Sequence, residues 1–366
     1  MFNFFKSNSK LGIDIGTASI KVIEFTKRAG RFALSNYGLF EFKGFSDTKD
    51  KTETIGPDKN ILKLPDQEII WGLKEVLKKS RIKSSDAVAS IPSFSTFATV
   101  IEMPYLSEGD LAKSIPFEAK KYIPAPLDSV ELAWSIIGIA NSPEPVQGQE
   151  QKGIKPATVE IFIAAVIKEE ANRYKNIMQG AGLNLRAIEL ENSALVRALL
   201  GNDLAPTAII NIGGRSTSIL IVDKGYERVS HNYEIGGFEI TKSISRSLGI
   251  SIDRAENLKK KVGLSQGDEN IVNQAMMSLV DMMVFETKKT ISSYEESKKT
   301  KVSKIILVGG LTNMPNFANY FKQQLGREVF MGNALARVVY PQELNKVIQE
   351  ISSTFAVAAG LAMREI

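Results

Sequence analysis

Residues 11–25 read Leu-Gly-Ile-Asp-Ile-Gly-Thr-Ala-Ser-Ile-Lys-Val-Ile-Glu-Phe, and this stretch decides the fold. The spacing predicts an apolar strand over 11–16, a turn of glycine and hydroxyl-bearing residues, and a second apolar strand over 20–26. A third strand is predicted over 31–42, so that the chain begins as a three-stranded meander. Asp14 lies inside the first strand among aliphatic side chains, and a carboxylate in that place requires an explanation.

A later stretch of the chain repeats this pattern. Residues 208–222 read Ala-Ile-Ile-Asn-Ile-Gly-Gly-Arg-Ser-Thr-Ser-Ile-Leu-Ile-Val, again a strand, a glycine turn with hydroxyl side chains, and another strand. A further strand is predicted over 226–234, the region 236–299 is mainly helical, and residues 304–310 predict a strand that runs into two glycines. Duplicated strand–turn–strand units indicate two similar domains that face each other.

Two facing glycine turns share one chemistry. A tight glycine turn exposes backbone N–H groups, the hydroxyls on it add donors, and glycine lets a ligand approach the backbone closely. Two such turns predict a site that holds a polyphosphate from both sides. Asp14 then has a role, because a carboxylate beside phosphates can hold a hydrated Mg²⁺. The alternative is that Asp14 caps its own turn through an Asx-type hydrogen bond.

The overall composition excludes several classes of protein. The 366 residues are 43% apolar and 24% charged with a net charge of +5, a balance that does not indicate nucleic-acid binding. The chain has no cysteine and a single histidine, His231, so thiolate sites, disulfides and histidine-based triads are not expected. No apolar run approaches the length of a membrane span, and the N-terminus lacks a signal-peptide core. We therefore expect a cytoplasmic protein.

A different texture begins near residue 86, and we interpret the stretch that follows as a small α/β unit inserted into a larger one. Polar loops are expected at 43–65 and 140–157. The other elements predicted between the two repeats are strands over 86–91, 94–103, 130–139, 158–167 and 183–190, and helices over 66–79 with Asp66 as N-cap, from Ser107 to about Tyr122, and over 168–181.

Together these motifs resemble those of the actin-like ATPase superfamily. The segments that carry the resemblance are a first phosphate motif at Asp14–Lys21, a second at Asn211–Thr217, an adenosine motif at Ile305–Asn313, and two hinge helices at Glu189–Ala198 and Phe355–Leu361. Small residues in the second hinge helix allow two helices to cross closely. The resemblance implies an α/β actin-like ATPase fold of two facing RNase H-like domains that bind ATP and Mg²⁺ between them.

One branch of the superfamily is indicated by a further segment. Gly236, Gly237, Glu256 and Lys259 follow the spacing of the FtsA branch, in which the glycines lie near phosphate and the two charged residues approach ribose and base. Without the resemblance, Glu256 and Lys259 would be taken as exposed helix charges.

The inserted unit indicates which family within that branch is most similar. FtsA and the PilM family of type IV pilus assembly proteins carry a small α/β subdomain, 1C, at this place. The segments Asp86–Pro92 and Glu118–Pro124, together with the Met103-Pro104 step, are similar to the PilM family in particular. The domains that the resemblance implies are residues 1–85 as the first part of domain 1, 86–167 as the inserted subdomain, 168–204 as the continuation of domain 1, 205–335 as domain 2, and 336–366 as the return to domain 1.

The resemblance also assigns binding residues, one motif at a time. It implies that Asp14 holds Mg²⁺ through water. The ATP-binding residues it implies are Asp14, Gly16, Thr17, Ala18, Ser19, Lys21, Gly213, Gly214, Ser216, Thr217, Gly236, Gly237, Glu256, Lys259, Gly309, Gly310, Thr312 and Asn313.

Hydrolysis is where the sequence departs from the superfamily pattern. The second phosphate motif normally begins with aspartate, but here the residue is Asn211, which keeps hydrogen bonding and loses the negative charge. Glu191 aligns with a glutamate that positions the attacking water in some actin-like proteins; the alternative is a solvated carboxylate on a helix. We predict that nucleotide binding survives and that hydrolysis is slow or absent.

Similarity to the PilM family implies a scaffold rather than a metabolic enzyme. The family implication is that the N-terminal peptide of the inner-membrane protein PilN binds in a groove between subdomains 1A and 1C, docking the scaffold at the inner face of the membrane. The residues assigned to that surface are Val88, Ile91, Phe97 and Val100; the alternative is that they form the core of the inserted unit. Further pilus components and self-association stay open as additional partners.

Three other functions compete with this one. An FtsA-type division protein usually ends in an amphipathic membrane helix, whereas this sequence stops at Ile366. A sugar or acetate kinase needs a positioned general base, and no obvious base lies near the first turn. A filament-forming actin-like ATPase stays open and would be revealed by sedimentation with ATP.

Overall fold

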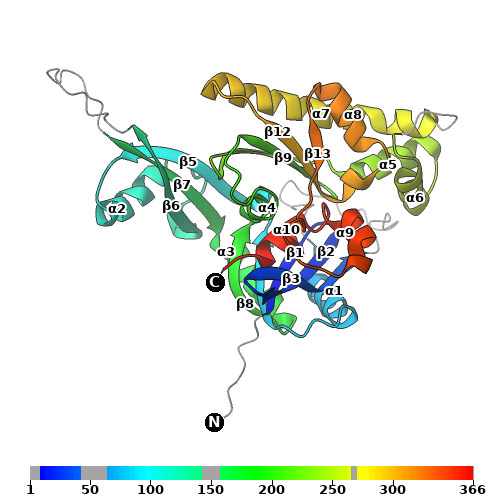
Figure 1. Ribbon diagram of the computed structural model, residues 1–366, viewed down its shortest axis with the longest axis horizontal. Helices are drawn as coiled ribbons and strands as arrows, with labels where there is room; N and C mark the ends of the chain where they lie inside the picture. Colours follow the sequence, from blue (N-terminus) through cyan, green and yellow to red (C-terminus); the bar gives the residue numbers. More distant parts are fainter. Residues whose placement is uncertain (1–8, 43–63, 142–156, 265–269, 366) are drawn as a thin grey trace, which may run out of the picture.

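The strands form three separate sheets in the computed structural model, which describes residues 9–42, 64–141, 157–264 and 270–365. Two sheets have five strands and the third has three. Figure 1 shows the two larger sheets on either side of a central pair of helices, with the three-stranded sheet extending to one side. This architecture is the mixed α/β class that the sequence predicts.

The first sheet contains the predicted meander, which is confirmed. Its order is β3-β2-β1-β4-β8, and β2 pairs antiparallel with both β1 and β3. One face of the sheet packs against two helices, α1 (Asp66–Lys79) and α3 (Lys168–Gly180). The strands are β1 (Ser9–Ile15), β2 (Ser19–Arg28), β3 (Arg31–Glu41), β4 (Asp86–Ile91) and β8 (Asn184–Leu190).

The start of α1 differs from the prediction by one residue. Pro65 is the N-cap residue, and Asp66 is the first residue of the helix. The Asp66 carboxylate is bonded instead to Arg173 of α3, with 2.7 Å between Nε and Oδ1. A tertiary ion pair therefore replaces the local cap that the sequence favours.

The second sheet repeats the arrangement of the first. Its order is β11-β10-β9-β12-β13, so that the second repeat also folds as a meander followed by parallel strands. Its strands are β9 (Thr207–Ile212), β10 (Thr217–Asp223), β11 (Tyr226–Tyr233), β12 (Lys304–Val308) and β13 (Val329–Met331). The helices associated with it are α5 (Gly237–Leu248), α6 (Ile252–Val262), α7 (Asn270–Lys298) and α8 (Phe317–Leu325).

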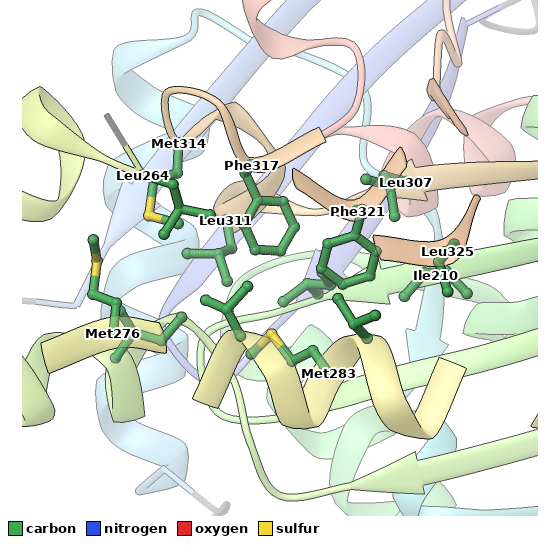
Figure 2. Close-up of a cluster of buried hydrophobic side chains, with 14 of the residues drawn as sticks. Ile210, Leu264, Met276, Met283, Leu307, Leu311, Met314, Phe317, Phe321 and Leu325 are labelled. Atoms are coloured by element: carbon green, nitrogen blue, oxygen red, sulfur yellow. The ribbon is translucent and has the colours of Figure 1, made fainter. Parts of the chain in front are cut away.

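The outer face of the second sheet forms one large core with these helices. Figure 2 shows Phe317 and Phe321 of α8 lying between the sheet and α7, whose Met283 points toward them. The two phenylalanine rings have centroids 4.8 Å apart. Ile210 faces this core, whereas its neighbour Ile209 faces the other way into the central core. Burial on both faces explains why the strand is apolar at successive positions.

The central core lies between the two five-stranded sheets. It is built around α4 (Glu191–Leu199) and α10 (Ala356–Ala362), and both sheets contribute buried aliphatic side chains to it. Every residue of α10 is buried. The prediction of two hinge helices that cross through small residues is therefore confirmed in its geometry.

Two glycines set the distance of that crossing. A Cβ atom on Gly360 of α10 would lie 2.0 Å from the carbonyl oxygen of Ala194 in α4. A Cβ atom on Gly12 of β1 would lie 2.1 Å from the carbonyl oxygen of Ala358. Backbone therefore touches backbone on both sides of α10, and side-chain atoms larger than hydrogen do not fit.

The inserted unit is a three-stranded antiparallel sheet with one covering helix. Its order is β5-β7-β6. The helix begins after Ser107, where the sequence predicts its start, and ends at Ala119 rather than near Tyr122. The Ser107 hydroxyl caps it by accepting from Asp110 N at 3.2 Å. Its strands are β5 (Thr96–Pro104), β6 (Val130–Asn141) and β7 (Thr158–Ile167), and its helix is α2 (Glu108–Ala119).

The predicted N-terminal boundary of the inserted subdomain, residue 86, is wrong. Strand β4, the first element of the range 86–167, pairs with β1 and β8 in the first sheet. Strand β4 is parallel to its neighbours and covered on both faces, so most of its residues are apolar. From the sequence alone, such a strand cannot be distinguished from a strand of the inserted unit. The separate sheet begins at β5.

Short elements complete the described part of the chain. These are the 3₁₀ helices η1 (Ser93–Ser95), η2 (Leu127–Ser129), η3 (Gly310–Asn313) and η4 (Gln342–Leu344), and helix α9 (Asn345–Ile351). Within the described ranges, no helix has both the length and the apolar character needed to cross a bilayer. The loops predicted at 43–65 and 140–157 fall largely outside those ranges.

We expect Gly360→Ala to lower the free energy of unfolding by about 1–3 kcal/mol, because the new methyl group meets backbone that cannot move aside. Gly109→Ala is the matched control, since nothing lies within 4 Å of a Cβ atom there and alanine favours helix. Urea unfolding of both variants measures the difference. Equal stability of the two variants would contradict the close crossing.

Candidate functional site

A cleft of about 970 Å³ lies where the two halves of the molecule meet. Its walls come from β1, from the turns that follow β1 and β9, from the starts of α4 and α5, from α6, and from the segment after β12. The sequence-predicted residues that line it are Asp14, Gly16, Thr17, Ala18, Ser19, Lys21, Glu191, Asn211, Gly213, Gly214, Ser216, Gly237, Glu256, Lys259, Gly309, Gly310 and Asn313.

The two glycine turns have the same internal bond and touch each other. Gly16 N donates to the Ser19 carbonyl at 3.0 Å, and Gly213 N donates to the Ser216 carbonyl at 2.9 Å. A Cβ atom on Gly214 would lie 2.6 Å from the Cβ of Ala18. The turns of the two repeats therefore meet across the cleft, and glycine at 214 is needed for them to approach so closely.

Asp14 has a partner on the neighbouring strand. It is buried, and its Oδ2 lies 3.0 Å from Lys21 Nζ in β2, directly opposite in the strand register. The ion pair explains how β1 tolerates a carboxylate in an apolar setting. The structure thus gives Asp14 a cross-strand ion pair in place of the Asx-type cap.

Glu191 begins helix α4 and lines the cleft close to Asp14. Its Oε2 accepts a hydrogen bond from Ser93 N at 3.2 Å and lies 3.3 Å from Ser93 Oγ. Burial raises the pKa of Glu191 to about 7, the charge of Asp14 adds to the rise, and the contacts with Ser93 act against it. The Glu191 side chain is thus partly buried and hydrogen-bonded, and it also lines the cleft.

Ser93 also begins a chain of buried polar contacts toward the second sheet. Its Oγ donates to Asn192 Oδ1 at 3.0 Å, and Asn192 Nδ2 donates to Glu227 Oε2 of β11 at 3.0 Å. Burial raises the pKa of Glu227 to about 7, and the bond from Asn192 acts against the rise. These contacts join the cleft, the start of the inserted unit and the second half of the molecule.

The same strand β11 is clamped to the inserted sheet. Arg228 donates to both carboxylate oxygens of Glu160 in β7, at 2.9 Å and 3.1 Å. A two-pronged guanidinium–carboxylate pair fixes geometry as well as charge. The inserted sheet is thus held to the second half of the molecule beside the polar chain from Ser93.

The start of α5 is bonded to the second glycine turn. Gly237 N donates to the Gly213 carbonyl at 3.0 Å, and Phe238 N donates to the Gly214 carbonyl at 2.7 Å. Helix α5 therefore fixes the position of the turn through its first N–H groups, which otherwise lack intrahelical partners.

Glu256 and Lys259 of α6 form a partly buried pair at the cleft wall. Lys259 Nζ lies 2.6 Å from Glu256 Oε2 and donates to the Gly237 carbonyl at 3.0 Å. Burial lowers the pKa of Lys259, and Glu256 acts against this. Because Lys259 is buried, the alternative that both residues are exposed helix charges is wrong.

The segment after β12 adopts a backbone that favours glycine. Gly309 has φ of +98°, and a Cβ atom there would lie 2.2 Å from the Ile212 carbonyl oxygen. Gly310 follows at the start of η3 and lines the cleft. The predicted motif thus presents backbone to the cleft beside the second turn.

Three predicted binding residues do not line the cleft. The Thr217 hydroxyl donates to the Ile235 carbonyl at 2.7 Å, and the Thr312 hydroxyl donates to the Gly309 carbonyl at 2.7 Å. Gly236 lies behind the second turn, where a Cβ atom would be 2.6 Å from the Gly214 carbonyl oxygen. These three residues contact other parts of the protein rather than the cleft, and they stabilise the segments that line it.

Other residues line the cleft without having been predicted. They include Ser93, Arg215, Phe238, Asp253, Lys260 and Ser353. Arg215 lies inside the second phosphate motif, Asn211–Thr217, and Phe238 directly follows Gly237, so both were open to recognition on that ground. The rest carry no local signal, because only tertiary packing brings their elements to the cleft.

The four residues predicted to contact a partner divide into two groups. Val88 and Ile91 are buried in β4, at 3% and 1% exposure. Val88 faces the central core, and Ile91 faces the core under α1 and α3. They offer no surface to a partner, and that prediction is wrong for them. Phe97 packs partly against the core of the inserted unit. Val100 is partly exposed and pairs in register with Phe162 of β7.

Comparison with known proteins identifies the family. A family model described as type IV pilus assembly protein PilM matches residues 12–366. The chain belongs to the PilM family. The resemblance drawn from the sequence is therefore confirmed.

Solved structures similar to this PilM family member show the actin-like ATPase fold. A PilM–PilN type IV pilus biogenesis complex matches with a TM-score of 0.77 and 20% identity, over 97% of this chain and 98% of that one. MreB5 of Spiroplasma citri bound to ADP matches with a TM-score of 0.51 and 14% identity, over 97% and 95%. The predicted fold class is confirmed by these similarities.

Curated relatives of this PilM family member include division proteins. The FtsA protein of Enterococcus faecalis is 20% identical over 361 residues, which cover 90% of this chain and 78% of FtsA. The FtsA protein of Bacillus subtilis is 23% identical over 268 residues, and the match spans 59% of its length. These similarities agree with the FtsA-like motifs in the sequence.

The donor set of the cleft fits a metal ion that arrives with a nucleotide. No group of three or more His, Asp or Glu side chains suited to a metal occurs in the described part of this PilM family member. Mg²⁺ keeps several waters and is usually held by one or two carboxylates together with phosphates. Asp14 at the first turn supplies one such carboxylate.

We expect Glu191→Gln to gain stability relative to the wild type as pH rises. The unfolded chain ionises Glu191 near pH 4.5, whereas the folded protein keeps the proton to about pH 7. The wild type therefore loses stability between these pH values. The difference in free energy of unfolding between the variant and the wild type grows by on the order of 1–3 kcal/mol. Urea unfolding across this pH range measures it.

Glu256→Gln is the control for that experiment. Burial opposes ionisation of Glu256, but Lys259 outweighs it and the pKa lies below its usual value. The stability that ionised Glu256 contributes is lost only below about pH 4.5. The difference in free energy of unfolding between Glu256→Gln and the wild type therefore stays constant over the same pH range. A flat difference for Glu191→Gln as well would show that its proton is not retained.

Proposed function

We propose that this chain is a nucleotide-binding scaffold of type IV pilus assembly, which recruits the N-terminal peptide of a PilN-type inner-membrane protein and hydrolyses ATP slowly or not at all. The observation that carries the proposal is the cleft in which two glycine turns meet at Gly214 and Ala18, in a member of the PilM family. Each later step of the proposal rests on this site.

ATP is the proposed ligand of the cleft. The turns at Gly16 and Gly213 supply backbone N–H groups for the phosphates, and the backbone at Gly309 and Gly310 supports the nucleoside. Glu256 and Lys259 are the proposed contacts to ribose and base. Mg²⁺ would neutralise phosphate charge when bound, and Asp14 would hold it through water.

Slow hydrolysis follows from the residues that surround the proposed phosphate site. Asn211 carries an amide where a carboxylate would help to hold Mg²⁺ and its waters. Glu191 accepts a hydrogen bond from Ser93 N at 3.2 Å, so its carboxylate is already engaged within the protein and is less free to orient an attacking water.

The partner is proposed to bind on the face of the inserted sheet that α2 does not cover. Ile101 and Met103 face the core under α2, so alternation places Val100 on the opposite face. That face also carries Glu160, which is held by Arg228 of the second half. A peptide laid there would contact the inserted sheet close to strand β11. The protein whose complex matches this fold is a PilM bound to PilN.

Docking through a partner would place this scaffold at the inner face of the cell membrane. The family is one of pilus assembly, and a PilN-type partner would supply the attachment.

We expect a synthetic PilN N-terminal peptide to bind saturably and more tightly when Mg·ATP is present, because nucleotide and peptide would be coupled through shared contacts. Val100→Asp should weaken peptide binding about 10-fold or more, since a charge on an apolar contact surface must be desolvated. Fluorescence anisotropy of the labelled peptide gives both Kd values.

Phe117→Asp is the control for the Val100 variant. Phe117 is 78% exposed on α2, which covers the other face of the sheet, so its replacement should leave the peptide Kd unchanged. A scrambled peptide controls for sequence. If the peptide does not bind with or without nucleotide, the proposed partner is wrong. If both variants weaken peptide binding equally, the proposed binding surface is wrong.

We expect Asn211→Asp to raise Mg²⁺-dependent phosphate release from ATP about 10-fold or more over a wild-type rate near background, because it adds a carboxylate at the second turn. Asn232→Asp, another amide in the cleft wall, is the matched control. Rapid turnover by the wild type, or no gain in the variant, would contradict the proposed role of Asn211.

A further inference from the structure

The lysines that line the cleft already have carboxylate partners. Lys21 lies 3.0 Å from Asp14, and Lys259 lies 2.6 Å from Glu256. Lys260 lies 3.4 Å from Glu256 and 3.8 Å from Glu41. A polyphosphate held by the glycine turns would bring three to four negative charges to them. A cation carried by a turn itself is therefore the one best placed to meet these charges.

Arg215 is that cation, and the second glycine turn carries it. It follows Gly214, whose backbone meets the first turn at Ala18. Its guanidinium carbon lies 5.5 Å from the centre of the Phe238 ring, which also lines the cleft. Burial lowers the pKa of Arg215, and Glu239 acts against this; a guanidinium stays protonated at neutral pH in any case.

Phe238 is itself held in place by the same turn. Its N–H donates at 2.7 Å to the carbonyl of Gly214, the residue that precedes Arg215. The Phe238 ring and the Arg215 side chain are therefore both held at the second glycine turn. A cation over an aromatic ring is held by the charge distribution of the ring rather than by its N–H donors, and the donors of a guanidinium suit phosphate oxygens. The ring thus orients Arg215 without using those donors.

We propose that Arg215, oriented by Phe238, binds the nucleotide polyphosphate directly and makes affinity rise with the number of phosphates. This inference rests on the proposed nucleotide-binding function and adds a residue to it. The arginine supplies fixed positive charge at the second turn, where Asn211 lacks the charge that would favour a metal ion. Preference for the triphosphate then depends on a side chain as well as on Mg²⁺.

Lys242 provides a matched comparison within the same structure. Its Nζ lies 5.1 Å from the centre of the same Phe238 ring and 2.5 Å from Glu239. Lys242 belongs to α5 rather than to the turn, and it is not among the residues that line the cleft. The two cations share a ring but differ in access to a ligand.

The test is isothermal titration of the full chain with adenosine, AMP, ADP and ATP in MgCl₂. We expect Arg215→Gln to leave the Kd for adenosine within about 2-fold and to weaken ATP by about 10- to 100-fold, the range for losing a charge-assisted hydrogen bond. AMP and ADP should fall between. Arg215→Lys should recover part of the loss, because charge returns without the planar donors.

Two further variants separate ligand contact from structure. Lys242→Gln should leave all four Kd values unchanged, and Phe238→Leu should give a smaller loss that also grows with phosphate number. Equal weakening of adenosine and ATP in Arg215→Gln would overturn the inference, as would no weakening at all. If the wild type binds none of the four ligands, the proposed nucleotide-binding function fails and this inference fails with it.

Discussion

The close contact of α10 with its neighbours is the constraint on which the rest of the structure depends. Gly360 lies against the backbone of α4 at Ala194, and Gly12 of β1 lies against Ala358. Because backbone touches backbone on both sides, the two large sheets come close enough for their glycine turns to meet. A bulkier residue at either glycine would separate the halves and open the site between them.

The meeting point of the turns determines the chemistry of the cleft. Each turn is a short strand connection that exposes N–H groups, and Gly214 lets the second turn approach Ala18 of the first. The charges around them are largely matched in pairs, as in Asp14 with Lys21. The N–H groups of the turns, rather than these paired charges, favour a ligand rich in negatively charged oxygens, which is why a polyphosphate is the ligand we propose.

The polar chain that leaves the cleft provides a physical route between the two proposed sites. Ser93 bonds to Glu191 in the cleft wall and to Asn192, which reaches Glu227 of β11. The same strand carries Arg228, which clamps the inserted sheet. A ligand that shifts one half against the other therefore acts on contacts that the inserted sheet shares, and binding at either site would affect the other by the same factor.

The sequence by itself determined the repeated strand–turn–strand units, the phosphate motifs and the small residues of α10, because glycine turns and apolar periodicity are local signals. It misplaced β4, Val88 and Ile91, since a doubly covered parallel strand has the same pattern wherever it lies. Only the tertiary structure decided that Asp14 pairs with Lys21, that Lys259 is buried, and that Ser93 reaches the cleft. Burial and long-range pairing depend on elements far apart in the chain, and no local pattern encodes them.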